Sequence, residues 1–258
     1  MTTKPTYVLV TGVAHTPIHM QTLAEALRRE SYPTEVVSHP TVGSSAATAP
    51  PNADARNLGK ILRDLVVNQH RQVVLLCHAY GGLVGCQCVN GLERSARAKQ
   101  GRDGGILKVF FLSGLLPQEG ESMLQVFGEA GIVPREWMDM HVSVLFRWSF
   151  SANSLAADTL YHDLPAEEAS HWATKLLPMS AHVGITPATD VCWNADIQKA
   201  YIFCTEDRVF SIEEQRRMLE RVQSDAKHDS IDWETYEMDC GHCPFLSHPK
   251  ELLDILKQ

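Results

Sequence analysis

Short apolar runs alternate with segments of helical periodicity along most of this 258-residue chain. The runs at 72–77 and 108–112 are apolar at successive positions, which is typical of strands buried on both faces of a sheet. Strands that alternate with helices form βαβ units, so the pattern predicts an α/β fold with a mostly parallel central sheet and helices on both faces. The predicted strands are residues 7–10, 35–37, 72–77, 108–112, 200–204 and 233–238, and the predicted helices are residues 21–30, 55–69, 81–92 and 249–257.

Residues 118–190 interrupt this alternation. The segment is rich in Trp, Met and Phe, and no linker flanks it on either side. We therefore expect a single domain over residues 1–258, with 118–190 as an inserted helical cap. Aromatic residues in a cap often serve both as packing and as the wall of an apolar pocket. On that basis Trp137 and Trp148 are candidate substrate contacts.

The charge balance and the cysteine count restrict the partners and the compartment. With 23 Lys plus Arg against 31 Asp plus Glu, the net charge is −8, which argues against a nucleic-acid partner. Apolar stretches stay below about ten residues, whereas a membrane-spanning helix needs about 20. The N-terminus lacks the apolar region and the cleavage site of a signal peptide. The odd count of seven cysteines then favours reduced thiols in a cytoplasmic protein.

The sequence Cys-His-Ala-Tyr-Gly-Gly at 77–82 joins a buried predicted strand directly to a predicted helix. A nucleophile elbow has this context, with small residues two positions before and after the central one, because strand and helix backbones nearly touch there. Gly81 meets that need, and Cys77 is the small residue on the other side. The central residue, which a strained backbone lifts above the sheet, is Ala79. Its methyl group cannot attack a carbonyl.

Four segments, in order, resemble those of the α/β-hydrolase superfamily: residues 8–13, 78–82, 204–207 and 241–242. Together they span nearly the whole chain. They resemble the compact branch of small esterases, which includes plant methylesterases, hydroxynitrile lyases and many fungal hydrolases. The resemblance implies the α/β-hydrolase fold and acyl transfer from an ester, and it implies no cofactor and no metal.

Carried over residue by residue, the resemblance implies a catalytic triad. The position of Ala79 corresponds to the nucleophilic serine, Asp207 to the acid and His242 to the general base, in the chain order of this fold. The backbone N–H groups of Tyr80 and Val13 correspond to the oxyanion hole. Each feature alone is common in ordinary turns, and their occurrence together and in order supports the interpretation.

Hydroxynitrile lyases of this branch differ from the esterases at two positions. They carry a threonine where the esterases have the glycine of a His-Gly pair, and a lysine directly after the catalytic histidine. Gly12 and Cys243 occupy these positions here, which favours an esterase over a cyanohydrin lyase. Thr11 stands where the esterases have histidine, and this departure leaves the geometry of the oxyanion loop open.

The sequence therefore predicts a serine-type esterase or lactonase for a small to medium apolar substrate, with Ala79 as a Ser→Ala substitution that traps a bound ligand. Two alternatives stay open. In one, Ala79 is native and the Asp207–His242 pair is the general base of a lyase, an isomerase or a cyclase. In the other, the protein binds a ligand without catalysis. Ser113, after a predicted strand, is at most a structural or substrate-contacting residue. The candidate substrate contacts are Gly12, His15, His78, Trp137 and Trp148.

Two further motifs carry less weight. The CGHC sequence at 240–243 matches disulfide oxidoreductases, but their motif lies at a helix N-terminus early in a thioredoxin-like domain rather than near the end of a chain. His15 and His19 are four residues apart, a spacing compatible with either a pocket or a metal. We expect a small-molecule ester or lactone as the partner, with no cofactor, metal, nucleic acid or membrane, and a homodimer stays open.

Overall fold

The computed structural model describes residues 4–44, 46–132, 136–142, 148–224 and 233–258, and at its centre lies a six-stranded sheet in the order β2-β1-β3-β4-β8-β9. The pairings between neighbouring strands of this sheet are parallel. The strands are β1 (Thr6–Val10), β2 (Thr34–Val37), β3 (Gln72–His78), β4 (Gly105–Leu112), β8 (Gln198–Cys204) and β9 (Glu234–Met238).

Strand β3 illustrates why the chain forms a sheet covered on both faces. Every residue of β3 after Gln72 is buried, and β1 and β4 pair with it on its two sides. All five residues of β1 are buried as well. Such continuous burial is expected of parallel strands that helices cover on both faces. The predicted α/β class and mostly parallel sheet are therefore confirmed.

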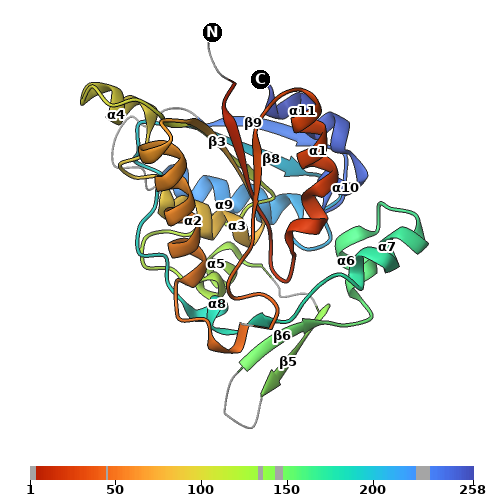
Figure 1. The fold of residues 1–258 in the computed structure, drawn as a ribbon. Helices are drawn as coiled ribbons and strands as arrows, with labels where there is room; N and C mark the ends of the chain where they lie inside the picture. Colours follow the sequence, from red (N-terminus) through yellow and green to blue (C-terminus); the bar gives the residue numbers. More distant parts are fainter. Residues whose placement is uncertain (1–3, 45, 133–135, 143–147, 225–232) are drawn as a thin grey trace.

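Helices cover both faces of this sheet (Figure 1). Helices α1 and α11 lie side by side on one face, whereas α2, α3 and α9 lie on the other. The amphipathic spacing of α1 explains its packing, because Leu23, Ala24 and Leu27 share its buried face. The main helices are α1 (Gln21–Arg29), α2 (Ala53–Arg63), α3 (Tyr80–Gly85), α4 (Arg94–Lys99), α9 (Ile212–Ser224), α10 (Pro244–Ser247) and α11 (Pro249–Leu256).

The segment inserted between β4 and β8 contains strands as well as helices, which corrects the expectation of a helical cap over 118–190. An antiparallel sheet of order β5-β6-β7 runs through it (Figure 1). Trp and Phe favour strands as well as buried helix faces, so composition did not distinguish the two. The inserted elements are α5 (Met123–Ala130), β5 (Met138–Val142), β6 (Trp148–Ala152), α6 (Ala156–Tyr161), α7 (Ala166–Ala173), β7 (Met179–Ser180) and α8 (His182–Ile185).

Candidate active site

The turn between β3 and α3 places Ala79 in a strained backbone conformation, with φ of 48° and ψ of −118°. Hydrogen bonds hold this conformation from both sides. The N–H of Ala79 donates to the carbonyl of Leu112 at 3.1 Å, and its own carbonyl accepts from the N–H groups of Gly82 and Leu115, each at 2.9 Å. Strain of this kind persists only where the surroundings determine it, and it is typical of functional sites.

Close backbone contacts explain the small residues of this turn. A Cβ atom on Gly81 would lie 2.7 Å from the carbonyl oxygen of Val10, so only glycine fits between β1 and α3. Cys77, which replaces the first small residue of the elbow, is accommodated differently. Its Sγ atom would lie 2.2 Å from a Cβ atom on Gly85, one turn into α3. Sequence reasoning identified Gly81 but missed Gly85, although a glycine inside a predicted helix was a visible signal.

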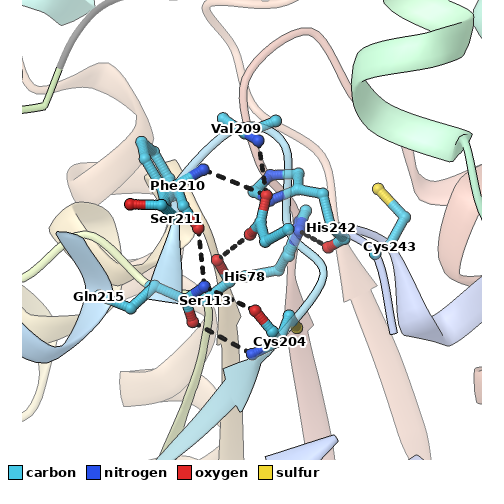
Figure 2. Close-up of polar contacts among 12 residues, drawn as sticks. His78, Ser113, Cys204, Val209, Phe210, Ser211, Gln215, His242 and Cys243 are labelled. Carbon is cyan, nitrogen blue, oxygen red and sulfur yellow. Dashed lines mark hydrogen bonds and ion pairs between the residues drawn. The ribbon is translucent and has the colours of Figure 1, made fainter. Parts of the chain in front are cut away.

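Asp207 and His242 form a buried pair, with Asp207 Oδ2 2.7 Å from His242 Nδ1 and side chains that are 0% and 3% exposed. Asp207 lies three residues beyond β8, and the other oxygen of its carboxylate accepts from the backbone N–H groups of Val209 at 2.7 Å and Phe210 at 3.1 Å (Figure 2). The N–H donors fix the orientation of the carboxylate. The carboxylate in turn orients the imidazole so that Nε2 is left for a reacting group.

Ser113 has a more direct place in the site than the sequence suggested. Its hydroxyl donates to Asp207 Oδ2 at 2.5 Å, so it shares this oxygen with His242 (Figure 2). Ser113 is buried and follows β4 with a positive φ of 41°. Gln215 of α9 supports the same region, because its side-chain amide bonds to the backbone N–H and carbonyl of Cys204 at the end of β8. Ser113 after β4 therefore holds Asp207 directly, and Gln215 of α9 holds the end of β8, which leads to Asp207.

The residues of the two expected oxyanion donors, Val13 after β1 and Tyr80 at the start of α3, lie beside the same cavity as Ala79. Gly12 allows the β1 loop to approach the turn, because a Cβ atom there would be 3.1 Å from the Ala79 Cβ and 3.0 Å from His78 Nδ1. Gly12 thus acts as a packing position, and it is absent from the cavity wall.

A buried polar network connects the loop after β1 to the turn. The Tyr80 hydroxyl donates to Asp54 Oδ2 at 2.9 Å, and Thr41 donates to the same carboxylate through its hydroxyl and its N–H. His39 Nε2 bonds to the carbonyl of Thr11 at 2.8 Å. Burial, with the nearby Asp54 carboxylate, raises the pKa of Tyr80 well above its usual value of 10.0. The phenol therefore stays protonated and acts as a donor.

A cavity lies in front of Ala79, which is one of its lining residues. Its wall is mostly apolar, and among the described residues it contains neither Lys, Arg, Asp nor Glu. Trp137 belongs to this wall as expected, whereas the side chain of Trp148 lies outside the described residues. The lining residues are Val13, His15, Ala79, Tyr80, Leu115, Met123, Phe127, Ile132, Trp137, Met138, Leu160, Val209, Phe210 and His242.

The two further candidate histidines differ in their access to the cavity. His15 lines it, with Nδ1 bonded to the carbonyl of Val13 at 2.8 Å and Nε2 accepting from the Tyr161 hydroxyl at 2.9 Å. Burial lowers the pKa of His15 well below 6.5, so the ring is neutral. His78 is fully buried behind the turn, where its Nε2 bonds to the carbonyl of His242 at 2.9 Å (Figure 2). His78 therefore braces the loop of His242, which corrects its assignment as a substrate contact.

The cysteines are all reduced and buried. Burial raises the pKa of Cys243 well above 9.0, with a further contribution from Asp207, so its thiol is protonated rather than a reactive thiolate. Within the described residues, no group of three or more His, Cys, Asp or Glu side chains has the arrangement of a metal site. In the same part of the chain, no helix combines the length and the apolar composition that crossing a membrane requires.

Comparison with known sequences extends over almost the full chain. The sequence profile of the alpha/beta hydrolase family matches residues 7–255. The chain is 28% identical over 267 residues to R7 of Phoma sp., a probable hydrolase. This match covers 99% of this chain and 98% of that protein. It is 25% identical over 259 residues to the alpha/beta hydrolase nvfD of Aspergillus novofumigatus, with 98% and 96% of the two chains covered.

Solved structures share the fold at lower sequence identity. Polyneuridine aldehyde esterase is similar with a TM-score of 0.76 and 18% identity, over 98% of each chain. Tomato methylketone synthase I, solved with 2-tridecanone, has a TM-score of 0.73 and 18% identity over 98% of this chain and 96% of that one. A pyrethroid hydrolase of Sphingobium faniae is similar with a TM-score of 0.69 and 16% identity, over 99% of this chain and 96% of that one. With its site built on this fold and the profile matching nearly its whole length, the chain belongs to the alpha/beta hydrolase family.

Proposed function

We propose that this site is that of an esterase or lactonase whose nucleophile position is occupied by Ala79, so that the chain as it stands binds its substrate without acyl transfer. One observation carries the proposal. The strained turn presents Ala79 to a cavity that His242 also lines, and His242 keeps its buried carboxylate partner Asp207. Family membership supports a hydrolase, and the cited relatives include hydrolases and an esterase by name.

With serine at position 79, the chemistry would follow from these positions. His242 Nε2 would take the proton of the serine hydroxyl as the oxygen attacks the carbonyl, and Asp207 would stabilise the imidazolium. The N–H groups of Val13 and Tyr80 would receive the negative charge of the tetrahedral oxygen. His242 would return the proton to the leaving alcohol, and water would then release the acid. Ala79 offers no oxygen for the first step.

The cavity wall favours a neutral, largely apolar substrate. Aromatic and aliphatic side chains provide most of its surface, and neither cation nor carboxylate is among its described lining residues. Its ionisable members are the neutral His15, the base candidate His242, and Tyr80, whose hydroxyl is bound to Asp54 outside the cavity wall. A charged acyl group would be desolvated there without a partner, which is costly. An ester or a lactone brings only a carbonyl for the oxyanion donors.

The substitution Ala79→Ser tests this proposal. We expect hydrolysis of nitrophenyl esters and of aliphatic or aromatic lactones to rise by several orders of magnitude, since loss of a nucleophile costs about 10⁶ in turnover in a serine protease. A second variant with both Ala79→Ser and His242→Gln is the matched control, and it should lack the gain. If Ala79→Ser folds normally by circular dichroism and hydrolyses none of these substrates, the proposal is wrong.

A second candidate function uses the site without a nucleophile. The Asp207–His242 pair keeps its full set of buried hydrogen bonds although position 79 is alanine. With a carbonyl bound by the oxyanion donors, His242 would remove a proton from the adjacent carbon and the donors would stabilise the enolate. That step begins many lyase, isomerase and cyclase reactions. Tomato methylketone synthase I has the same fold and was solved with a ketone, which makes ketones reasonable probes.

Deuterium exchange distinguishes this second function. The unsubstituted chain is incubated with 2-tridecanone or acetophenone in D₂O, and NMR follows loss of the protons next to the carbonyl. Exchange that His242→Gln abolishes supports proton transfer. Binding of these ketones without exchange, together with no hydrolysis in Ala79→Ser, would instead identify a ligand-binding protein without catalysis.

A further inference from the structure

Four consecutive residues of the inserted segment, Leu160–Asp163, contact the cavity and both of the loops that carry the site. Leu160 lies in the cavity wall, and Tyr161 ends α6. Their partners in the main domain are far away in the sequence, by 146 residues for the bond between Tyr161 and His15 and by 78 for the bond between Asp163 and Gly241. In Figure 1, α6 lies at the junction between the inserted strands and the main domain.

The carboxylate of Asp163 binds the loop of His242 at two points. Its Oδ2 atom accepts from the backbone N–H of Gly241 at 2.8 Å, directly before His242, and from the hydroxyl of Ser247 at 2.6 Å, at the end of α10. The Asp163 side chain is only 13% exposed. Charge-assisted hydrogen bonds from two donors hold a carboxylate strongly in such surroundings.

The side chains of this segment lie so close to the loop that they leave no room for a Cβ atom on Gly241. A Cβ atom on Gly241 would lie 2.8 Å from Asp163 Oδ1 and 2.8 Å from His162 Cε1. Real Cβ atoms do not tolerate such contacts with groups that are packed in place. The residue before His242 must therefore be glycine as long as Asp163 and His162 keep these positions.

Tyr161 makes the corresponding contact with the other loop. Its hydroxyl donates to His15 Nε2, and the opposite ring nitrogen of His15 bonds to the carbonyl of Val13, whose N–H is an expected oxyanion donor. Tyr161 is fully buried and His15 is 1% exposed, so water does not compete for these bonds. The Tyr161 side chain is thus linked to the backbone of Val13 through the ring of His15.

We infer that Leu160–Asp163 is a positioning element, in which Asp163 holds the loop of His242 and Tyr161 holds the loop of Val13. The inserted segment is then part of the active-site scaffold as well as a cover for the cavity. A ligand that packs against Leu160 and one that contacts His242 stabilise the same arrangement. This inference rests on the proposed function only in treating His242 as the base.

The test reads the geometry of His242 by NMR in the unsubstituted Ala79 background, where no turnover is required. The probe is the Nδ1 proton of His242, assigned by its loss in His242→Gln. We expect Asp163→Ala to shift or abolish this signal by weakening the bond to Asp207. Asp163→Asn should largely retain it, because the amide oxygen still accepts from Gly241. Glu167→Gln, at an exposed carboxylate of α7, is the matched control and should leave the signal unchanged.

Two further variants keep the outcome decisive if Asp163→Ala fails to fold. Ser247→Ala removes one donor to Asp163, and Tyr161→Phe removes the bond to His15. We expect the first to shift the His242 signal and the second to leave it in place. The inference is overturned if Asp163→Ala folds and its His242 signal is the same as in the Glu167→Gln control. If Asp163→Ala does not fold, an unchanged His242 signal in Ser247→Ala overturns it instead.

Turnover gives an independent comparison in the Ala79→Ser background. There, Asp163→Ala should lower kcat about 100-fold with KM little changed, as expected for a small displacement of a catalytic group. If Ala79→Ser shows no hydrolysis but the NMR signal responds to Asp163→Ala, the proposed function fails and the positioning role stands. If hydrolysis appears and the NMR signal does not respond, the positioning role fails alone.

Discussion

The hydroxyl of Tyr80 donates a hydrogen bond of 2.9 Å to the buried carboxylate of Asp54. Tyr80 directly follows Ala79 and is one of the two proposed oxyanion donors, so this bond holds that residue to the start of α2. A hydrogen bond to a charged group contributes about 1.5–3 kcal/mol. The bond therefore links the stability of the fold to the geometry of the site.

We expect Tyr80→Phe to lower the free energy of unfolding by about 1.5–3 kcal/mol, because the Asp54 carboxylate loses one of its buried donors. Urea denaturation followed by circular dichroism measures the change. Tyr236→Phe is the matched control, since the Tyr236 hydroxyl bonds to Glu234 at the surface, and it should change stability by less than about 0.5 kcal/mol. Equal effects of the two substitutions would show that the Asp54 bond is not a special contributor.

Gly85 and Cys77 form a size-complementary pair, and a double-mutant cycle tests it. Gly85→Ala should destabilise the protein by about 1–3 kcal/mol, because its Cβ would lie 2.2 Å from the Cys77 sulfur. In a Cys77→Gly background the same substitution should cost much less. Gly128→Ala in α5 is the control, since the described residues leave open space around Gly128 and alanine favours a helix. Additive effects of Gly85→Ala and Cys77→Gly would contradict this explanation.

Ser113 shares an oxygen of Asp207 with His242, which predicts a contribution to the rate. In the Ala79→Ser background, Ser113→Ala should lower kcat about tenfold with little change in KM. The loss of this hydrogen bond should raise the activation free energy by about 1.36 kcal/mol, which corresponds to a factor of ten in rate. Steady-state ester hydrolysis measures both constants. The control is Ser95→Ala, whose hydroxyl bonds to the carbonyl of Asp196 at the surface, and it should have no effect. A change confined to KM would instead place Ser113 in substrate binding.

Buried histidines predict that stability falls on the acid side of neutrality. Burial lowers the pKa of His15 and His78 well below 6.5, so the folded state binds fewer protons than the unfolded state does. Their contribution to stability is present above pH 6.5 and is lost as the pH falls below it. Urea denaturation from pH 7 to pH 5 should therefore show a steady decrease in the free energy of unfolding. Replacing the exposed His70 by Asn should leave this slope unchanged, and a flat profile in the unsubstituted chain would refute the prediction.

Much of the architecture could be predicted because each strand and the helix after it lie close together in the sequence. Apolar runs and amphipathic spacing identified the six strands of the main sheet and the helices α1, α2, α3 and α11, whereas α4 and α9 were not predicted. The order of Ala79, Asp207 and His242 could also be identified, since each follows the end of a strand. Parallel strands bring their carboxyl ends to one edge of the sheet, which is where this structure places the three residues together.

The inserted segment was harder to predict, for a physical reason. Residues such as Met138 and Phe150 suit a buried helix face as well as a strand, and the pairing partner decides between them. His78 shows a similar limit. A histidine beside the nucleophile position suggests substrate contact, but its ring is used to brace the carbonyl of His242, which lies 164 residues away in the sequence.

The sequence by itself determined the fold class, the absence of a side-chain oxygen at Ala79, and the placement of Asp207 and His242 after the ends of successive strands, because these depend on residue identity and local periodicity. Only the tertiary structure decided which groups support that site. The contact of Asp163 with Gly241 joins residues that are separated by 78 positions in the sequence, and the contact of Ser113 with Asp207 joins residues separated by 94 positions. A hydrogen bond is sensitive to changes of a few tenths of an ångström in the distance between donor and acceptor. These distances are set only when the whole chain has packed.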